Sequence, residues 1–535
     1  MEALTTLGRS AHGARRTTLR LRRGPEDKAD ALDLDHWLAR SVTHGELGKS
    51  AARGVAWTLA GSWMSAAVQV GTTMVLARLL TPADFGLMAM ALTLTALVNQ
   101  FRQLGLSQAV VQRPDLRWSQ VSALFWVNTA VGVVLAGLVA LGGIPLAAFY
   151  DEPALVPLCA ALGAGFVVSG VSVQHGALLN RAMQFRRISL RNVTAGLLSS
   201  LAALAAALLG LGVWALVVQN VSALVFATIL NWWAVPWRPS SPRRLADAAP
   251  LLRFGIHVSV ANLFHTVSRE GDNVVIGRFL DAGALGLYTR AYSLLMLPLR
   301  QLKTPVQAVM VPTLAALQEE PGRYRLAYRT AIAGLCHAGM PLVVVLAVAA
   351  DEVIAVVLGD QWLAAARIFQ LLALASFVQL VSTTTGWIYT STGRGRPYVA
   401  WAVVGGVVTV AGFLVGVRWG VQGVAASYAA TQLLLVVPGF ALACRHSPVA
   451  LGDPFRAMAR PSVVAALVLV TTAGVRSAVV PRVSAPLALA ATVAGALVVW
   501  GVVMMLWPAA RRELVGLVAS LRRRRADRES SAGSH

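Results

Sequence analysis

Ionisable side chains occur inside a stretch of the chain that is apolar and long enough to cross a membrane, residues 255–280. Insertion of a charged residue at the centre of a membrane helix costs roughly 2.5–3.5 kcal/mol, so such a stretch must turn its polar face to protein, water or a ligand. Steps of three and four residues place most of its polar side chains on one helical stripe. The residues on this stripe are Asn262, His265, Arg269, Asp272 and Asn273. Glu270 points to one side of it.

The composition predicts a membrane protein with many spans. Of the 535 residues, 56% are hydrophobic and only 13% are charged, and the mean hydropathy is +0.64. Soluble domains carry roughly 25% charged residues. The formal net charge of +22 comes mostly from short loops and the termini, which is the positive-inside pattern rather than a nucleic-acid-binding face. The cysteines are isolated and the histidines form no metal-binding motif, so we expect no metal site and no cofactor.

Apolar runs of spanning length follow one another from Gly54 onward, and together they predict an all-α bundle of about fourteen transmembrane helices. The predicted spans are 54–80, 84–103, 119–142, 154–174, 190–210, 212–235, 255–280, 284–315, 327–349, 363–391, 397–417, 421–443, 460–480 and 485–508.

The charges of the loops predict the orientation. Arginines gather in alternate loops, for example at Arg243 and Arg244, whereas the opposite loops hold few cations and several acids. Both termini are therefore expected in the cytoplasm. Residues 1–50 contain no apolar segment typical of a signal peptide and predict a disordered tail. Residues 509–535 form a basic tail, which either lies on anionic lipid as a short amphipathic helix or only anchors the topology.

The chain repeats itself at an offset of about 200 residues. Val75–Ala91 and Val275–Ala291 are identical at six of 17 positions, and a weaker match links the sixth and twelfth spans. Because six is an even number, both copies enter the membrane from the same side, so we expect parallel repeats. The predicted lobes are residues 54–235 (spans 1–6) and 255–443 (spans 7–12), and 460–508 holds two extra spans.

Comparison of the two lobes predicts a cationic site between them. Gln69, Gln100 and Gln103 of the N-lobe correspond to Arg269, Arg300 and Lys303 of the C-lobe. Guanidinium and ammonium groups in a water-filled cavity suit an anionic, phosphate-bearing substrate. Arg290, nearer the outer end of its span, is a further candidate. The alternative is internal pairing, with Arg269 bound to Asp272 or Glu270 and with Arg300 or Lys303 reaching an interface.

Other polar residues are candidates for secondary roles. Gln69, Asn99, Gln100 and Asn128 are expected to line the neutral lobe and to bond sugar hydroxyls, unless they only join neighbouring helices. Asp272 or Glu270 is a candidate for carrying a coupling proton. Arg78 and Arg278 occupy equivalent outer ends of their spans, which favours a shared structural role over a functional one.

Four segments resemble the polysaccharide transporter family of the MOP superfamily, the Wzx-type flippases. They are Leu76–Gly86, Gly271–Arg278, Leu285–Tyr292 and Val357–Trp362, and the resemblance runs from about Gly48 to Ala443. It implies a V-shaped, two-lobed bundle that moves polyprenyl-pyrophosphate-linked oligosaccharides between the leaflets of a bacterial cytoplasmic membrane by alternating access. It also implies a cationic cavity that holds the pyrophosphate, in keeping with Arg269 and Arg300.

The sequence therefore predicts a flippase for lipopolysaccharide or exopolysaccharide synthesis and not an enzyme. Its expected partners are the lipid-linked oligosaccharide, membrane lipids and, beyond these, a polysaccharide polymerase and glycosyltransferases, but no nucleic acid. One alternative is a cation-coupled drug exporter of the MATE type, which would need acidic residues in the cavity of the N-lobe. Another is a membrane-embedded glycosyltransferase or polymerase, which would need a catalytic carboxylate and commonly has a large external loop.

Overall fold

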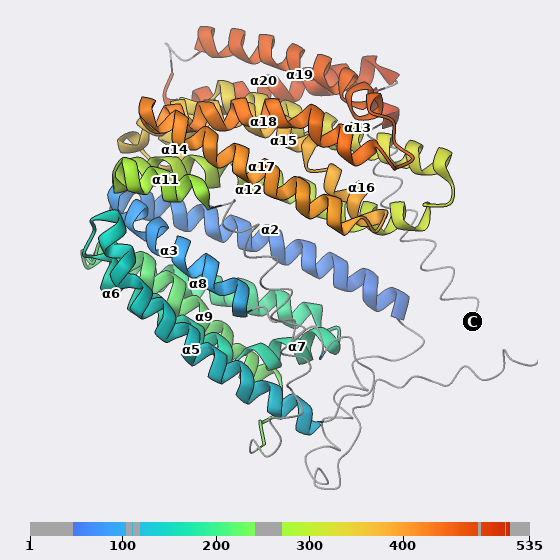
Figure 1. Cartoon of the computed structure of the whole chain (residues 1–535). Helices are drawn as coiled ribbons and strands as arrows, with labels where there is room; N and C mark the ends of the chain where they lie inside the picture. The colour runs from blue at the N-terminus through green and yellow to red at the C-terminus, as the bar shows by residue number, and fades with distance from the viewer. Residues whose placement is uncertain are drawn as a thin grey trace, which may run out of the picture.

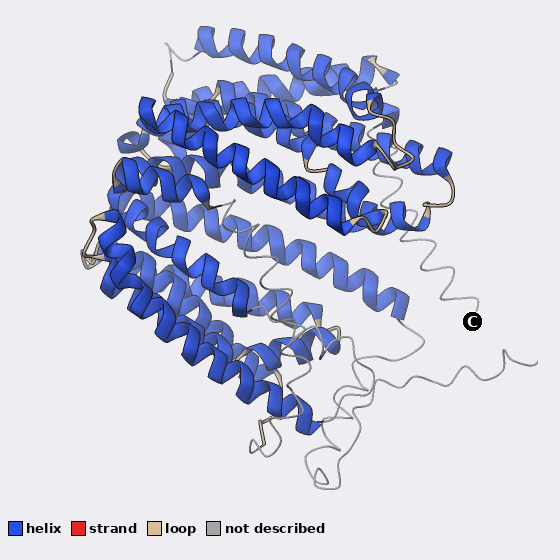
Figure 2. Ribbon diagram, viewed as in Figure 1, coloured by secondary structure: helices blue, strands red, loops and turns tan. Residues whose placement is uncertain are grey.

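The computed structural model describes residues 47–102, 110, 118–240, 270–479, 483–508 and 510–513. Within these residues every regular element is a helix, and the helices are joined by short loops (Figure 2). In Figure 1 they form two groups, which we call the first half (residues 47–240) and the second half (residues 270–513).

The described residues of the first half form seven helices, in which α2 packs on α8, α5 packs on α6, and α8 packs on α9. Their bounds are α2 (Leu47–Leu79), α3 (Pro82–Arg102), α5 (Trp118–Tyr150), α6 (Leu155–Gly170), α7 (Val173–Arg181), α8 (Phe185–Leu208) and α9 (Trp214–Ala234).

The second half holds the other helices, and its last two, α19 and α20, pack on each other and on α13 at the edge of the bundle (Figure 1). The bounds are α11 (Gly271–Phe279), α12 (Ala282–Ala316), α13 (Pro321–Val348), α14 (Ala350–Val357), η2 (Asp360–Trp362), α15 (Ala364–Ser382), α16 (Thr385–Ser391), α17 (Gly395–Gly416), η3 (Val417–Trp419), α18 (Gly420–Cys444), α19 (Gly452–Val479) and α20 (Ala485–Leu506).

The apolar helices agree with a membrane protein of many spans. Nine helical segments of the described residues are long and apolar enough to cross a membrane, or ten if α6 and α7, which meet at a bend of 43°, form one span. One of these segments, 395–444, contains both α17 and α18. Most of the predicted span 255–280 lies outside the described residues, and the other predicted spans each overlap an observed helix.

The structure adds interruptions that the apolar pattern did not reveal. The predicted span 154–174 ends early, and α7 follows after a bend; the predicted span 363–391 breaks into α15 and α16; and the short helix α14 follows α13 directly. Hydropathy averages over about 19 residues and therefore does not detect a local bend.

Local capping fixes where α3 and α12 begin. At the start of α3, the backbone N–H of each of two residues donates to the side chain of the other. Thr81 N donates to Asp84 Oδ2 (2.9 Å), and Asp84 N donates to Thr81 Oγ1 (3.3 Å). This is a capping box. Asp281 caps α12 by accepting a hydrogen bond from Ala284 N (2.7 Å). Thr81 and Asp281 differ by 200 in number, so both helices of the repeated segment start at matching positions.

The two halves meet where these helix starts lie, and we call this region the closed end. Here α3 packs along the beginning of α12, and α11 touches α3 and α5. Gly86 lies against the Ala282 carbonyl and Gly286 lies against the Pro82 carbonyl, with no space for a side chain at either glycine. Small residues permit such close approach of helices in membranes.

Polar and aromatic contacts join the halves at the closed end. Trp362 is buried, donates from Nε1 to Ala77 O (2.8 Å) and meets the Phe85 ring edge to face at 5.3 Å. Arg78 donates to Val356 O (2.9 Å), and the Arg278 guanidinium lies 5.7 Å from the centre of the Phe149 ring. Arg78 and Arg278 thus each contact the opposite half.

Candidate functional site

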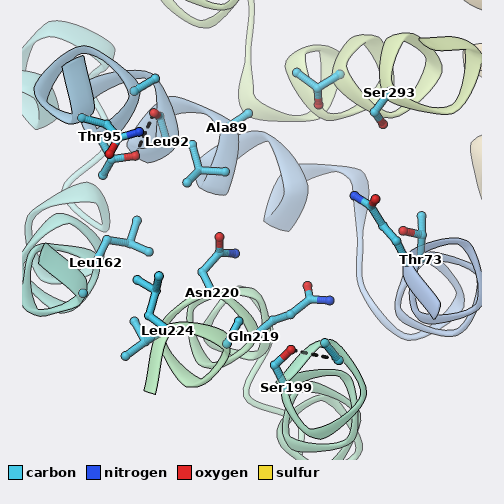
Figure 3. A pocket seen from close by; sticks show the side chains of 18 of the residues that line it. Thr73, Ala89, Leu92, Thr95, Leu162, Ser199, Gln219, Asn220, Leu224 and Ser293 are labelled. Atoms are coloured by element: carbon cyan, nitrogen blue, oxygen red, sulfur yellow. Dashed lines mark hydrogen bonds between the residues drawn. The ribbon is translucent and has the colours of Figure 1, made fainter. Parts of the chain in front are cut away.

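A cavity of about 850 Å³ lies between the halves (Figure 3). The first half contributes residues of α2, α3, α6, α8 and α9 to its lining, and the second half contributes residues of α11 and α12 together with Glu270. A volume of this size is typical of ligand sites, which measure roughly 300–1,000 Å³. The cavity is therefore large enough for a substantial ligand, and residues from both halves would contact it.

The wall from the first half is uncharged apart from one arginine, and it combines neutral polar side chains with apolar ones. In Figure 3 the amide groups of Gln219 and Asn220 on α9 point into the space between the helices, and Ser293 of α12 faces them from the second half. Amide and hydroxyl groups both donate and accept hydrogen bonds, which suits a ligand rich in hydroxyl groups. Representative residues of this wall are Gln69, Thr73, Thr95, Asn99, Gln219 and Asn220.

Arg300 supplies a positive charge from the opposite wall. It lies near the middle of α12, its side chain is exposed to the cavity, and it makes no hydrogen bond or ion pair with the rest of the described chain. A guanidinium group presents five N–H donors in a planar fork. Arg300 is therefore free to bind an anionic ligand.

Arg290 is held in place by an aromatic ring. Its guanidinium lies 4.7 Å from the centre of the Phe85 ring, which belongs to the first half, and its buried Nε has no hydrogen-bond partner among the described residues. It is ten residues before Arg300, or about 15 Å along the helix axis. The two arginines thus mark two levels of one cavity.

Arg102 is a third cavity arginine, which was not among the residues that the sequence predicted for the site. It is the last residue of α3, and its Nε donates to Asn99 Oδ1 (2.6 Å) while Nη1 donates to Ser169 Oγ. The i, i+3 spacing from Asn99 is the signal that could have identified this pair, because residues three apart share a helix face. The side-chain oxygen of Asn99 therefore already accepts a hydrogen bond from Arg102.

Two carboxylates also line the cavity. Glu270 Oε2 accepts a hydrogen bond from Asn273 Nδ2 (2.9 Å), and Asp272 Oδ1 accepts one from Asn273 N (2.8 Å). Asn273 therefore holds both acids at the start of α11. Neither acid forms an ion pair with another described residue, so the described lining carries three arginines and two unpaired carboxylates.

The remaining predicted residues lie elsewhere. Lys303 Nζ donates to Gln379 O (3.3 Å) of α15, inside the second half, and Gln100 Nε2 donates to Ala96 O (3.4 Å) on its own helix. Neither residue is among those that line the cavity, and the same holds for the buried Asn128. Arg269 lies outside the described residues. Arg300 and Lys303 are three residues apart on one helix, and this spacing does not tell which of the two faces the cavity. The rotation of the helix in the folded protein decides it.

The sequence matches a known family over more than half of its length. The profile described as "Polysaccharide biosynthesis protein" matches residues 75–367. The chain is 24% identical over 322 residues to the lipopolysaccharide biosynthesis protein WzxC of Escherichia coli. The aligned part covers 60% of this chain and 65% of WzxC, so the chain spans slightly less than two thirds of that relative. It is 26% identical to the teichuronic acid biosynthesis protein TuaB of Bacillus subtilis, over 65% of this chain and 72% of TuaB.

A third relative and two solved structures agree with this match. The succinoglycan biosynthesis transport protein ExoT of Rhizobium meliloti is 26% identical over 68% of this chain and 73% of ExoT. The fold is similar to lipid II flippase MurJ (TM-score 0.64, 10% identity, 84% of this chain and 98% of MurJ). It is also similar to an inward-facing multidrug resistance MATE transporter of the MOP superfamily (TM-score 0.57, 14% identity, 75% of this chain and 98% of that chain). The chain belongs to the polysaccharide biosynthesis protein family.

Proposed function

We propose that this protein is a flippase that moves polyprenyl-pyrophosphate-linked oligosaccharides across a bacterial cytoplasmic membrane for the synthesis of a surface polysaccharide. The relatives are named for lipopolysaccharide, teichuronic acid and succinoglycan biosynthesis, and one of them is named a transport protein. A lipid II flippase shares the fold. These comparisons favour transport of a lipid-linked glycan over catalysis.

The observation that carries the proposal is the contrast between the two walls of the cavity. Arg290 and Arg300 of α12 face a wall of the first half whose polar groups are amides and hydroxyls, apart from Arg102, which is hydrogen-bonded to Asn99 and Ser169. The substrate has the same two-part chemistry, with a pyrophosphate at one end and sugar hydroxyls at the other. Bidentate bonds from a guanidinium to phosphate are short and strong, whereas sugar hydroxyls pair well with neutral amides.

In this proposal Arg300 and Arg290 bind the pyrophosphate, and Gln69 and Asn99 belong to the wall that binds sugar. Arg269 remains a predicted phosphate ligand on the strength of the sequence. Lys303 and Gln100 do not contact the substrate in this proposal, because their side chains donate hydrogen bonds to backbone carbonyls of the protein instead. A polymerase and glycosyltransferases are proposed partners, to be tested by co-purification from the native membrane.

The arrangement of the halves supports alternating access. We propose fourteen spans in which spans 1–6 and 7–12 form two parallel repeats related by an axis along the membrane normal, as a V-shaped bundle, with α19 and α20 added. The matching helix starts at Thr81 and Asp281 support this relation. With both termini in the cytoplasm, the closed end faces outward and the cavity opens inward. Labelling of a cysteine introduced at Arg243 from outside the cell would contradict this orientation.

Glu270 and Asp272 are proposed to couple transport to a cation gradient, with protonation as the simplest mechanism. They are the carboxylates of the described cavity lining, and they line the same cavity as the arginines that would bind the substrate. Replacing each acid by its amide should abolish any stimulation of transport by a proton gradient while leaving substrate binding intact.

A drug exporter of the MATE type is the alternative, and the similar fold of a multidrug transporter favours it. However, the described lining from the first half contains no carboxylate, and a cationic drug would meet Arg290 and Arg300. Export of cationic dyes from vesicles that do not transport the lipid-linked glycan would establish this alternative.

The direct test uses purified protein in vesicles and a defined polyprenyl-pyrophosphate oligosaccharide. We expect Arg300→Ala to lower the transport rate at least tenfold and Arg300→Lys to restore it only in part, because ammonium lacks the planar fork. Arg323→Ala, at an exposed arginine paired with Glu320, is the matched control and should transport normally. Full transport by an Arg290→Ala, Arg300→Ala double variant of normal stability would exclude the proposed role of these arginines.

A further inference from the structure

A second cavity of about 490 Å³ adjoins the main one and lies toward the end of the bundle opposite the closed end. Its lining residues come from the stretch 58–69 of α2, from the end of α7 at Asn180, from the stretch 185–192 of α8, and from the second half at Gln301. Ser65 and Gln69 line both cavities, so the two spaces are neighbours. We call the second space the annex.

Facing polar stripes on α2 and α8 build this path. On α2 the stripe steps by three or four residues, and Thr58, Ser62 and Gln69 are exposed along it. From Thr58 to Thr73 it extends about 22 Å along the helix. The stripe consists of Thr58, Ser62, Ser65, Gln69 and Thr73. On α8, Ser189 and Asn192 line the annex and Ser199 and Ser200 line the main cavity.

The annex differs from the main cavity in charge. None of its described lining residues has an ionisable side chain, whereas the main cavity holds arginines and carboxylates. Arg191, which precedes the lining residue Asn192, is directed at Asn192 Oδ1, to which Nε (3.1 Å) and Nη2 (2.7 Å) both donate. The Asn192 Nδ2 donors are thus left for a ligand. A charged group entering the annex would lose water without gaining an ion pair with any described lining residue, which is costly.

The annex is also too polar for a lipid chain. Its hydroxyls at Thr58 and Ser62 donate to backbone carbonyls one turn earlier, at 2.8 Å each, so their oxygens remain as acceptors. The amides of Gln69 and Gln301 make no hydrogen bond with other described residues. An apolar chain would leave these groups without partners, whereas a sugar offers hydroxyls to each of them.

Neighbouring residues of α12 connect the annex to the proposed phosphate site. Arg300 lies in the main cavity and Gln301 lies in the annex. When the phosphate of a ligand is bound at Arg300, the sugars attached to it can extend toward Ser65 and Gln69, which line both cavities.

We propose that the annex is a binding site for neutral sugar residues of the transported glycan, beyond the sugar that is attached to the pyrophosphate. This inference rests on the proposed function and adds to it a preference: glycans whose outer sugars are uncharged fit the annex, and outer sugars that carry a carboxylate do not.

The test replaces the polar lining with apolar side chains in Ser62→Leu, Asn192→Leu. Both positions are exposed, so the double variant has space for the larger groups. The matched control is Ala67→Leu, Thr194→Leu, on the same two helices at exposed positions that line neither cavity. Thermal unfolding of both variants in detergent checks that they fold alike.

Transport into vesicles is measured for two polyprenyl-pyrophosphate substrates, one with a single sugar and one with a neutral oligosaccharide. We expect the annex variant to transport the oligosaccharide about tenfold more slowly and the single-sugar substrate at the wild-type rate, and the control to transport both normally. For wild type, uronic acid in the outer sugars should slow transport.

The outcomes separate the two proposals. Equal slowing of both substrates by the annex variant, or no slowing of either, would overturn the annex as a sugar site while the flippase function stands. Wild-type protein that transports neither substrate would instead contradict the proposed function, and the annex proposal with it.

Discussion

Gly86 and Gly286 lie at the crossing of α3 and α12, and each is packed against the backbone at the start of the other helix. Gly86 contacts the Ala282 carbonyl, Gly286 contacts the Pro82 carbonyl, and a Cβ on Gly286 would also lie 3.2 Å from Gly86 N. All four positions match in pairs at an offset of 200 residues. The reciprocal contact lies in the closed end, where α3 packs on α12 (Figure 1 shows both helices).

Gly86→Leu should force the closed end apart. Overpacking of a tight contact typically costs about 1–3 kcal/mol, and here the backbone leaves no space for relaxation of a side chain. We expect transport to be lost and a cysteine introduced at the buried Leu285 to react with a water-soluble maleimide only when Gly86→Leu is also present. Gly71→Leu on α2, where a Cβ meets nothing within 4 Å, is the control. Unchanged labelling would show that the crossing tolerates bulk.

Trp362 should stabilise the closed end through both its ring and its N–H group. Trp362→Phe removes the hydrogen bond to Ala77 O and should lower the free energy of unfolding by about 0.5–1.5 kcal/mol, whereas Trp362→Ala should lower it by about 3–5 kcal/mol. Thermal unfolding in detergent measures both. Trp233→Phe, at a highly exposed tryptophan, should have no effect. A Trp362→Ala variant as stable as wild type would contradict the assigned contact.

Arg290 should need both its charge and its planar shape. Arg290→Lys keeps a positive charge but cannot stack flat on Phe85 or offer a fork to phosphate, so we expect it to recover only part of the affinity that Arg290→Ala loses. Binding of the lipid pyrophosphate should weaken roughly tenfold in Arg290→Ala, which corresponds to about 1.4 kcal/mol. Phe85→Leu should give a smaller loss. Equal binding by the Lys variant and wild type would show that charge alone suffices.

Arg476 should hold the end of α19 on α14. Its Nε donates to Glu352 Oε1 (2.9 Å) and its Nη2 donates to Asp351 Oδ2 (2.5 Å) on α14. Because Glu352 is buried, Arg476→Gln leaves a carboxylate without its partner and should lower the melting temperature. Adding Glu352→Gln removes that stranded charge.

The double variant Arg476→Gln, Glu352→Gln should therefore be more stable than Arg476→Gln alone. The control is Arg367→Gln, at an exposed arginine that bonds only Gln370 among the described residues. Additive losses from the two substitutions would mean that Arg476 and Glu352 do not interact.

The repeat in the sequence predicted a shared structural role for Arg78 and Arg278, but not their contacts. Each arginine contacts the other half, Arg78 through the Val356 carbonyl and Arg278 through the Phe149 ring. In the cavity, Arg300 and Lys303 share a helix face to within one turn, and Arg300 lines the space while Lys303 turns to Gln379. The sequence did not identify Arg102 as a cavity residue, because an arginine at the end of an apolar run is indistinguishable from an arginine in the following loop.

By itself the sequence determined that the chain is an all-helical membrane protein, roughly where its helices lie, and that its second half carries more charge within the spans. The length of an apolar run and the charge of the loop that follows it are local properties, because each depends only on residues that are neighbours in the chain. Only the tertiary structure decided which cations face the cavity, that Arg290 rests on Phe85 of the other half, and that polar stripes on α2 and α8 meet to form the annex. These relationships depend on the rotation and crossing of helices far apart in the chain, which side-chain packing sets.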